Sequence, residues 1–225
     1  MLNFKEISKA LLPYHCLLCD EMHSDAAICQ HCLADLPWHP TNSCLQCGLV
    51  ANNLICGHCL KQPPHYDRTH AVFNYIYPVA AILQHYKYRH VLHISQVMGE
   101  FLAEKIIGKP IDALIAMPLH PNRILNRGFN QSLEIAKIVA KISAIPLDVA
   151  SCHRVIDTPP QASLPLKARV NNIKGAFKCT GNFTGRRIAL IDDVMTSGAS
   201  LNELAKSIKK AGATEVDCFV IARTQ

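Results

Sequence analysis

Eight of the 11 cysteines lie before residue 60, and they form four Cys-x-x-Cys pairs. In a reducing compartment, such a pair points both sulfurs of a turn at one tetrahedral metal rather than forming disulfides. Two pairs complete one four-cysteine site, so we expect two structural zinc ions. The expected ligands are Cys16, Cys19, Cys29, Cys32, Cys44, Cys47, Cys56 and Cys59. A disulfide-bonded or redox-active module is the alternative, but the N-terminal residues do not read as the secretory signal that would favour it.

How the four pairs combine is a separate question. Sequential pairing closes two short loops and loses less chain entropy than interleaved pairing, so we favour it while interleaved pairing stays open. Gly48 follows the second cysteine of the third pair, where the turn requires a positive φ that glycine adopts without steric cost. Asp20 occupies the equivalent position of the first pair, so the first site departs from this pattern.

Charge is divided unevenly along the chain. Residues 1–66 contain three basic and five acidic side chains, whereas residues 67–225 contain 20 basic and 12 acidic ones. Four thiolates around each zinc would add negative charge to the first segment, so if a polyanion binds, we expect the second segment to hold it. A composition of 49% hydrophobic and 18% charged residues excludes a disordered chain. No apolar run approaches the roughly 18 residues of a membrane span, so we expect a soluble, cytoplasmic protein.

After the cysteines, the chain alternates between strands and helices. Short apolar or alternating runs predict strands at residues 70–77, 113–117, 188–191 and 216–222. Helical periodicity predicts helices at residues 80–88, 93–107, 131–143 and 199–211. This alternation predicts an α/β fold with a parallel sheet, helices on both faces and ligands at the carboxyl ends of the strands. A proline-containing connector places the domain boundary between residues 64 and 65, giving a zinc-ribbon module at 1–64 and an α/β domain at 65–225.

The strongest candidate site is the segment 188–200, which reads Ile-Ala-Leu-Ile-Asp-Asp-Val-Met-Thr-Ser-Gly-Ala-Ser. Asp192 and Asp193 follow the apolar strand, where carboxylates can accept hydrogen bonds from sugar hydroxyls or help to hold Mg²⁺. The loop after them opens a helix, and its N–H groups and hydroxyls can surround a phosphate. The loop residues are Thr196, Ser197, Gly198, Ala199 and Ser200. A generic turn with an acidic helix cap is the alternative, which two adjacent acids beside an apolar strand disfavour.

Three further segments carry basic side chains suited to phosphates. Arg123 and Arg127 lie in residues 117–132, which otherwise read as a solvated basic loop. Arg169 lies in residues 154–177, a stretch without periodicity whose length is typical of a functional lid or a disordered loop. Lys87 lies between Tyr86 and Tyr88, where bases could stack, although an amphipathic helix edge explains that pattern equally well.

Residues 188–200 resemble the phosphoribosyl-pyrophosphate motif of type I phosphoribosyltransferases along their whole length. The resemblance implies that Asp192 and Asp193 act as the catalytic acids that hold the ribose hydroxyls. It also implies that the following loop holds the 5′-phosphate and that Mg²⁺ accompanies phosphoribosyl pyrophosphate. By the same resemblance, residues 117–132 form the pyrophosphate loop and residues 154–177 the flexible loop that closes over the substrate.

The whole chain resembles the ComF family of competence-associated proteins, which includes GntX-like members. The paired cysteine ribbons, the Pro-Pro connector, Tyr86-Lys87-Tyr88, Arg-Gly-Phe-Asn-Gln and the Asp-Asp-Val motif occur in the family's order. The resemblance implies a zinc ribbon followed by a type I phosphoribosyltransferase-like domain that handles incoming single-stranded DNA during natural transformation. It further implies a DNA-uptake helicase or a recombination protein as partner. An active phosphoribosyltransferase and a ligand-sensing regulator without turnover remain alternatives, because the acceptor pocket of this fold has no motif.

Overall fold

The computed structural model describes residues 14–23, 27–89, 93–157 and 173–225. Its packing divides the chain into two compact units, Met1–Pro37 and Trp38–Gln225. In the smaller unit, β1 (Tyr14–His15) pairs antiparallel with β2 (Met22–His23), and α2 (Gln30–Ala34) follows them. The domain boundary expected between residues 64 and 65 stays a prediction, because a division by packing does not test which segments fold independently.

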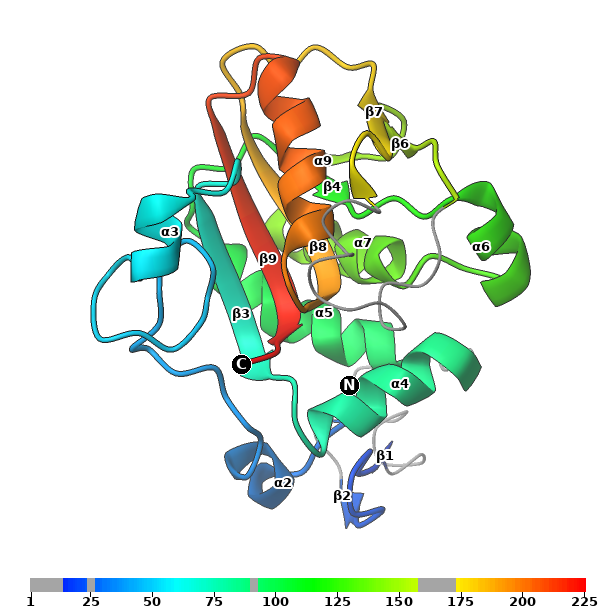
Figure 1. Cartoon of the computed structure of the whole chain (residues 1–225). Coiled ribbons are helices and arrows are strands. Elements are labelled where there is room, and N and C mark those ends of the chain that lie inside the picture. The colour runs from blue at the N-terminus through cyan, green and yellow to red at the C-terminus, as the bar shows by residue number, and fades with distance from the viewer. Residues whose placement is uncertain (1–13, 24–26, 90–92, 158–172) are drawn as a thin grey trace. The chain divides into compact units, whose positions relative to one another are not determined.

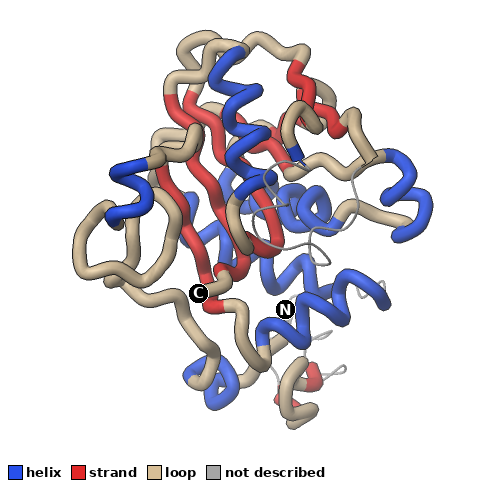
Figure 2. Tube along the Cα trace, in the orientation of Figure 1, coloured by secondary structure: helices blue, strands red, loops and turns tan. Residues whose placement is uncertain are grey.

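A five-stranded parallel sheet forms the centre of the larger unit (Figures 1 and 2). Its order is β3-β9-β8-β4-β5, with all neighbouring strands parallel. The strands are β3 (Arg68–Asn74), β4 (Ala113–Ala116), β5 (Leu147–Asp148), β8 (Arg187–Met195) and β9 (Glu215–Arg223). Nearly every residue of β8 and β9 is buried, as expected for central strands covered on both faces. The structure therefore confirms the α/β fold class predicted from the alternating pattern.

Helices cover both faces of this sheet. Figure 1 shows α9 in front of the sheet, with α5 and α7 behind it. Among the described residues of the larger unit, the helices are α3 (Gly57–Lys61), α4 (Val79–Arg89), α5 (His93–Ile106), α6 (Pro121–Arg127), α7 (Gln131–Ser143) and α9 (Ala199–Lys210). The Asn130 side chain accepts hydrogen bonds from Ser132 N and Leu133 N, which satisfies N–H groups of the first turn of α7 and fixes where that helix begins.

The elements that the sequence pattern misses are short. β6 (Cys152–Arg154) pairs antiparallel with β7 (Phe177–Cys179), and three-residue strands are too short to show a periodicity. α6 starts at a proline within the segment expected to be a loop, and the His120 side chain caps it. Within the described ranges, no helix combines the length and the apolar character that a bilayer crossing requires.

Candidate functional site

The eight expected zinc ligands gather into two groups of four. Each group places its four sulfur atoms within 4.8 Å of one another, so four thiolates surround one point, as a tetrahedral zinc requires. The groups are Cys16, Cys19, Cys29 and Cys32, and Cys44, Cys47, Cys56 and Cys59. This arrangement confirms sequential pairing and the two predicted four-cysteine sites. The backbone N–H groups of Cys29 and Cys56 donate to the sulfurs of Cys16 and Cys44 at 3.4 and 3.3 Å, and donors to sulfur favour the thiolate that binds zinc.

The turns beside these ligands explain the departure at Asp20. Gly48 has a φ of +69°, as expected, and Asp20 has a φ of +61°. Aspartate is among the non-glycine residues that adopt this region most readily. The first site therefore keeps the backbone geometry of the second without the glycine.

The second cysteine group packs against the edge of the parallel sheet, within the larger unit. The backbone N–H of Thr69 on β3 donates to Leu45 O at 2.8 Å. The ring of His39 forms a hydrogen bond to Gly48 O at 2.8 Å, and Val50 N donates to the Gln225 side chain at 3.1 Å. The first of these contacts attaches a turn of the second group to the open edge of β3, which would otherwise expose unpaired backbone groups. The other two attach its turns to the segment before the group and to the segment after β9.

The two acids of the phosphoribosyl-type motif are buried at the carboxyl end of β8. Asp192 is 9% exposed and Asp193 is 3% exposed. Ser132 Oγ donates to Asp192 Oδ1 at 2.8 Å, and Lys87 Nζ lies 2.6 Å from Asp193 Oδ2. Two carboxylates thus face one lysine, which leaves one negative charge without a compensating cation from Lys87. Carboxylate oxygens in that state suit ligand groups that donate hydrogen bonds, such as sugar hydroxyls.

The surroundings shift the pKa values of the two carboxyl groups in opposite directions. Burial and the charge of Asp193 raise the pKa of Asp192. Burial alone would raise the pKa of Asp193, but the Lys87 ammonium outweighs burial and holds the pKa of that carboxyl below its usual range. One neighbouring pair therefore contains one carboxyl held ionised and one that protonates more readily.

The loop after these acids has a backbone conformation and a close packing that favour glycine. Gly198 has a φ of +75° and caps α9 at its N-terminus. A Cβ atom at this position would lie 2.7 Å from Met195 Cε and 3.1 Å from the Tyr66 hydroxyl. Asn202 N donates to Gly198 O at 2.8 Å, which starts the helix directly after the loop. The N-terminus of a 12-residue helix thus follows Thr196, Ser197 and Gly198, the arrangement that favours a bound phosphate.

The arginines expected to contact pyrophosphate or nucleic acid lie on α6. Arg123 Nε is 4.0 Å from Asp157 Oδ1, and Arg127 donates to the Gln131 side chain at 2.8 Å. Arg169 lies outside the described residues. The structure adds Arg154, which sequence reasoning passed over; it is 6% exposed and its guanidinium lies 5.7 Å from the Phe177 ring centroid. Burial and the nearby charge of Arg123 lower the pKa of Arg154 to about 10.

Arg223, at the end of β9, is a second side chain that sequence reasoning missed. It is 3% exposed, and its Nε donates to Cys47 O at 2.7 Å. One terminal nitrogen donates to Met195 O at 3.1 Å, to Thr224 O at 2.7 Å and also to Thr196 O. A buried arginine has no sequence signal of its own, because the strand pattern accepts any side chain at a strand end.

A cavity of about 680 Å³ opens beside Arg223. The second cysteine group lines it with Cys47 and Cys59, and the loop after the acids lines it with Thr196, Ser197 and Gly198. Tyr66 and Leu49 supply apolar surface. The second zinc site and the phosphate-type loop therefore border the same space.

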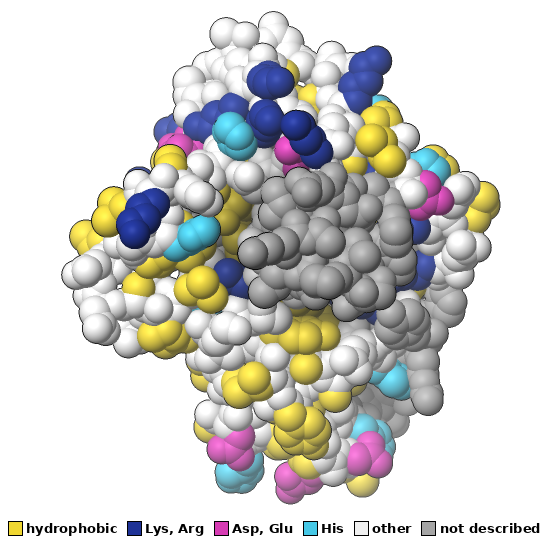
Figure 3. All heavy atoms as spheres, viewed as in Figure 1, with side chains coloured by type: hydrophobic (Ala, Val, Ile, Leu, Met, Phe, Trp, Pro, Cys, Tyr) yellow, Lys and Arg dark blue, Asp and Glu magenta, His cyan; other side chains and the backbone are white. Residues whose placement is uncertain are grey.

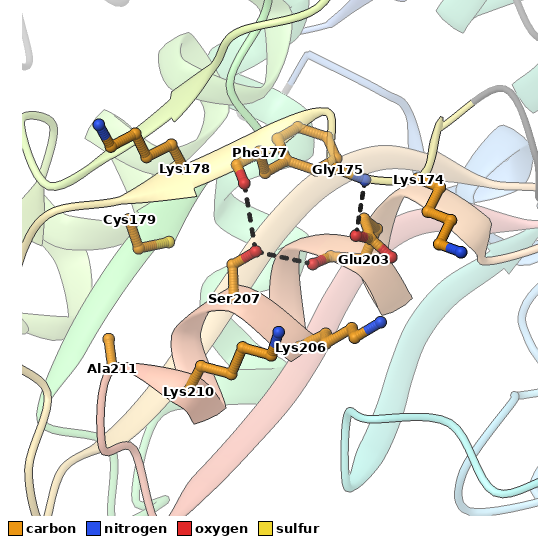
Figure 4. A pocket seen from close by; sticks show the side chains of 10 residues that line it. All are labelled: Lys174, Gly175, Phe177, Lys178, Cys179, Glu203, Lys206, Ser207, Lys210 and Ala211. Carbon is orange, nitrogen blue, oxygen red and sulfur yellow. Dashed lines mark hydrogen bonds between the residues drawn. The ribbon is translucent and has the colours of Figure 1, made fainter.

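A second pocket, of about 510 Å³, lies between α9 and the segment that leads into β7 (Figure 4). Lys206 and Lys210 project from one side of α9, and Lys174 and Lys178 come from the opposite wall. Glu203 is the acidic residue of the lining, and its carboxylate accepts a hydrogen bond from Gly175 N at 2.9 Å. Figure 3 shows Lys and Arg side chains gathered over the C-terminal half of α9. Four lysines against one glutamate make this pocket attractive to phosphate groups.

Family models match two parts of the chain. The model of the Double zinc ribbon domain matches residues 7–63, and that of the Phosphoribosyl transferase domain matches residues 130–225. The second match agrees with the parallel sheet and the loop after β8. It also covers Asp192, Asp193 and the helix N-terminus that follows them.

Two relatives match most of the chain. The "DNA utilization protein YhgH" of Salmonella typhi is 30% identical over 190 residues, which is 80% of this chain and 84% of the relative. The "Competence protein F" of Haemophilus influenzae is 29% identical over 218 residues, which is 92% of this chain and 90% of the relative. Among solved structures, a purine phosphoribosyltransferase from Pyrococcus horikoshii is 22% identical, with a TM-score of 0.35 over 57% of this chain and 73% of its own.

Proposed function

Because the chain belongs to the ComF family of competence and DNA-utilization proteins, we propose that it handles incoming single-stranded DNA in the cytoplasm during natural transformation. In this proposal, the phosphoribosyltransferase-like domain binds the strand through its basic surface and binds a phosphoribosyl ligand beside Asp192 and Asp193. The observation that carries it is the presence, on one domain, of a phosphate-type loop and a separate four-lysine pocket.

The phosphoribosyl ligand fits the end of β8 by charge and by donor type. Its phosphate would accept hydrogen bonds from the N-terminus of α9 and from the hydroxyls of Thr196, Ser197 and Ser200. Its ribose hydroxyls would donate to the carboxylates of Asp192 and Asp193, which retain one negative charge after the ion pair with Lys87. A phosphoribosyl group would therefore have hydrogen-bond donors for its phosphate and carboxylate acceptors for its ribose hydroxyls, on either side of one short loop.

The single strand fits the four-lysine pocket. None of these lysines has an ion-pair partner among the described residues, so no acidic group of that part of the chain needs to be displaced when a phosphodiester approaches. Lys206 and Lys210 are four residues apart on α9 and lie on one face of the helix. Two lysines on each wall can contact successive phosphates of a flexible strand without reading its sequence.

The experiment is a salt titration of affinity for a fluorescent oligothymidylate, measured by anisotropy. We expect the logarithm of the association constant to fall with the logarithm of salt concentration, with a slope of about −0.7 for each phosphate neutralised. Replacing Lys206 and Lys210 together by glutamine should make this slope shallower by roughly 1.4. The matched control replaces Lys105 of α5 and Lys141 of α7, which lie on the helices behind the sheet, and should leave the slope unchanged. A wild-type affinity that does not respond to salt would refute the proposal.

A phosphoribosyltransferase that uses phosphoribosyl pyrophosphate and Mg²⁺ is the second candidate, and the paired acids favour it. Carboxylates are the ligands that Mg²⁺ prefers, so Asp192 and Asp193 would hold the ion, and the ion would neutralise charge on the leaving pyrophosphate. Lys87 stands at 2.6 Å from Asp193 and already neutralises that carboxylate, so it would have to withdraw first. This contact favours a binding or sensing role without turnover over catalysis.

Pyrophosphate release distinguishes a catalytic phosphoribosyltransferase from a protein that binds or senses the ligand without turnover. Wild-type protein is incubated with phosphoribosyl pyrophosphate, Mg²⁺ and each common nucleobase, and pyrophosphate is measured against a sample without base. Release that depends on a base and is lost in Asp193→Asn would establish catalysis. Tight binding without release supports the sensing role.

A further inference from the structure

Arg223 joins two sites that the sequence places far apart. The second zinc site consists of Cys44, Cys47, Cys56 and Cys59, and the phosphate loop consists of Thr196–Ser200. The Arg223 guanidinium donates to the carbonyl of the ligand residue Cys47 at 2.7 Å and to the carbonyls of Met195 and Thr196 at the start of the loop. One rigid, planar group thus contacts the backbone of both sites.

These contacts fix the direction in which the loop presents its donors. A trans peptide is planar, so its N–H and C=O groups point in opposite directions. Arg223 holds the carbonyls of Met195 and Thr196, so the N–H groups of Thr196 and Ser197 must point away from it. The arginine therefore orients two backbone donors of the loop.

The second zinc site also lies beside the buried charge of Arg223. The guanidinium is buried, and no described carboxylate forms an ion pair with it. Four thiolates around Zn²⁺ carry a net charge of about −2, which offsets the buried cation. Loss of zinc would remove the bonds that hold the four ligands around one point, and so would loosen the turn that presents Cys47 O to Arg223.

We infer that Arg223 is a positioning residue that couples the second zinc site to the phosphate loop, so that zinc at one and a phosphate group at the other bind cooperatively. The identity of the phosphate compound rests on the proposed function, whereas the coupling rests on the contacts of Arg223. Coupling of this kind is reciprocal: whatever factor zinc adds to anion affinity, the anion adds to zinc affinity.

The test uses the full chain with both zinc ions and compares Arg223→Met with Arg187→Met. Arg187, at the start of β8, forms an ion pair with Asp112 and serves as a control for the loss of an arginine. Zinc release to a chromophoric chelator is followed in time, with and without ribose 5-phosphate. We expect two release phases in the wild type, of which ribose 5-phosphate slows one. In Arg223→Met, we expect that phase to be faster by roughly 10–100-fold and insensitive to the ligand. Arg187→Met should match the wild type.

Two further measurements keep the inference open to refutation. If Arg223→Met does not fold, Arg223→Lys keeps the charge but loses the planar fork, and should show the same change in smaller degree. Hydrogen exchange of the Thr196–Ser200 amides, with and without chelator, reports the coupling even if ribose 5-phosphate fails to bind the wild type, a failure that would count against the proposed function only. Equal release rates in wild type and Arg223→Met, together with loop exchange that zinc removal leaves unchanged, would overturn the inference.

Discussion

Substituting Gly198 by alanine tests whether the phosphate loop needs its observed backbone. The substitution meets two penalties at this position. Alanine at a φ of +75° costs about 1 to 2 kcal/mol relative to glycine. The added Cβ would also lie 2.7 Å from Met195 Cε and 3.1 Å from the Tyr66 hydroxyl, and both side chains are buried. Met195 Cε is the end of a flexible side chain, whereas the Tyr66 ring is rigid, so we expect this crowding to cost about 1 kcal/mol, the low end for overpacking. The combined loss is about 2 to 3 kcal/mol.

Gly185 offers a matched control. Its φ is +77°, nearly the same as that of Gly198, but no atom lies within 4 Å of a Cβ built on it. Gly185→Ala therefore incurs the backbone penalty of about 1 to 2 kcal/mol without the contacts. The difference between the two variants isolates the crowding of the loop by Met195 and Tyr66.

Calorimetry measures both variants. For a chain of this length, 1 kcal/mol corresponds to roughly 2–4 °C, so Gly198→Ala should lower the Tm by roughly 4–12 °C and Gly185→Ala by less. Titration with ribose 5-phosphate should show at least a ten-fold loss of affinity in Gly198→Ala and none in Gly185→Ala. Equal Tm values and equal affinities for the two variants would refute the assignment of this loop as a built phosphate site.

Three other predictions concern the acids, their lysine and the zinc. Because the pKa of Asp192 is raised in the folded state, the folded protein binds a proton that the unfolded chain releases above about pH 4, so stability falls as pH rises from there. In parallel melting curves, the Tm of Asp192→Asn should therefore rise relative to that of the wild type as pH increases from 4 to 7. A difference in Tm that does not change with pH would contradict this. Lys87→Met leaves both buried carboxylates without their cation and should destabilise by roughly 3–5 kcal/mol in urea titrations near neutral pH, and less in acid; an unchanged midpoint would show that the ion pair with Asp193 contributes little. Elemental analysis should find two zinc atoms per chain, and removal of both by chelator at neutral pH should lower the Tm; zero or one atom would contradict the two four-cysteine sites.

The sequence was sufficient for the parts of this protein that repeat a local pattern. Sequential zinc pairing followed from short loops, and α7 begins and ends at the predicted residues because its apolar spacing and the Asn130 cap agree. β8 extends beyond the predicted apolar run, because Asp192 and Asp193 continue the strand although their charge interrupts the pattern. Two acids after an apolar run indicate a site, but they do not show whether the strand ends before them or continues through them.

What the sequence could not supply was contact between distant segments. Lys87 and Asp193 are 106 positions apart, and Cys47 and Arg223 are 176 apart. No local spacing connects such pairs, because tertiary packing brings them together. Lys87 was expected to contact pyrophosphate or nucleic acid, and that role remains a prediction. In the structure, Lys87 forms an ion pair with Asp193.

The measurement that tests the central claim most directly is a crystal structure of the zinc-loaded protein soaked with ribose 5-phosphate. The account predicts the phosphate on the N–H groups and hydroxyls of Thr196–Ser200, with the ribose hydroxyls on Asp192 and Asp193. A phosphate bound only among the lysines of the α9 pocket, with Lys87 still on Asp193 and the loop empty, would contradict it.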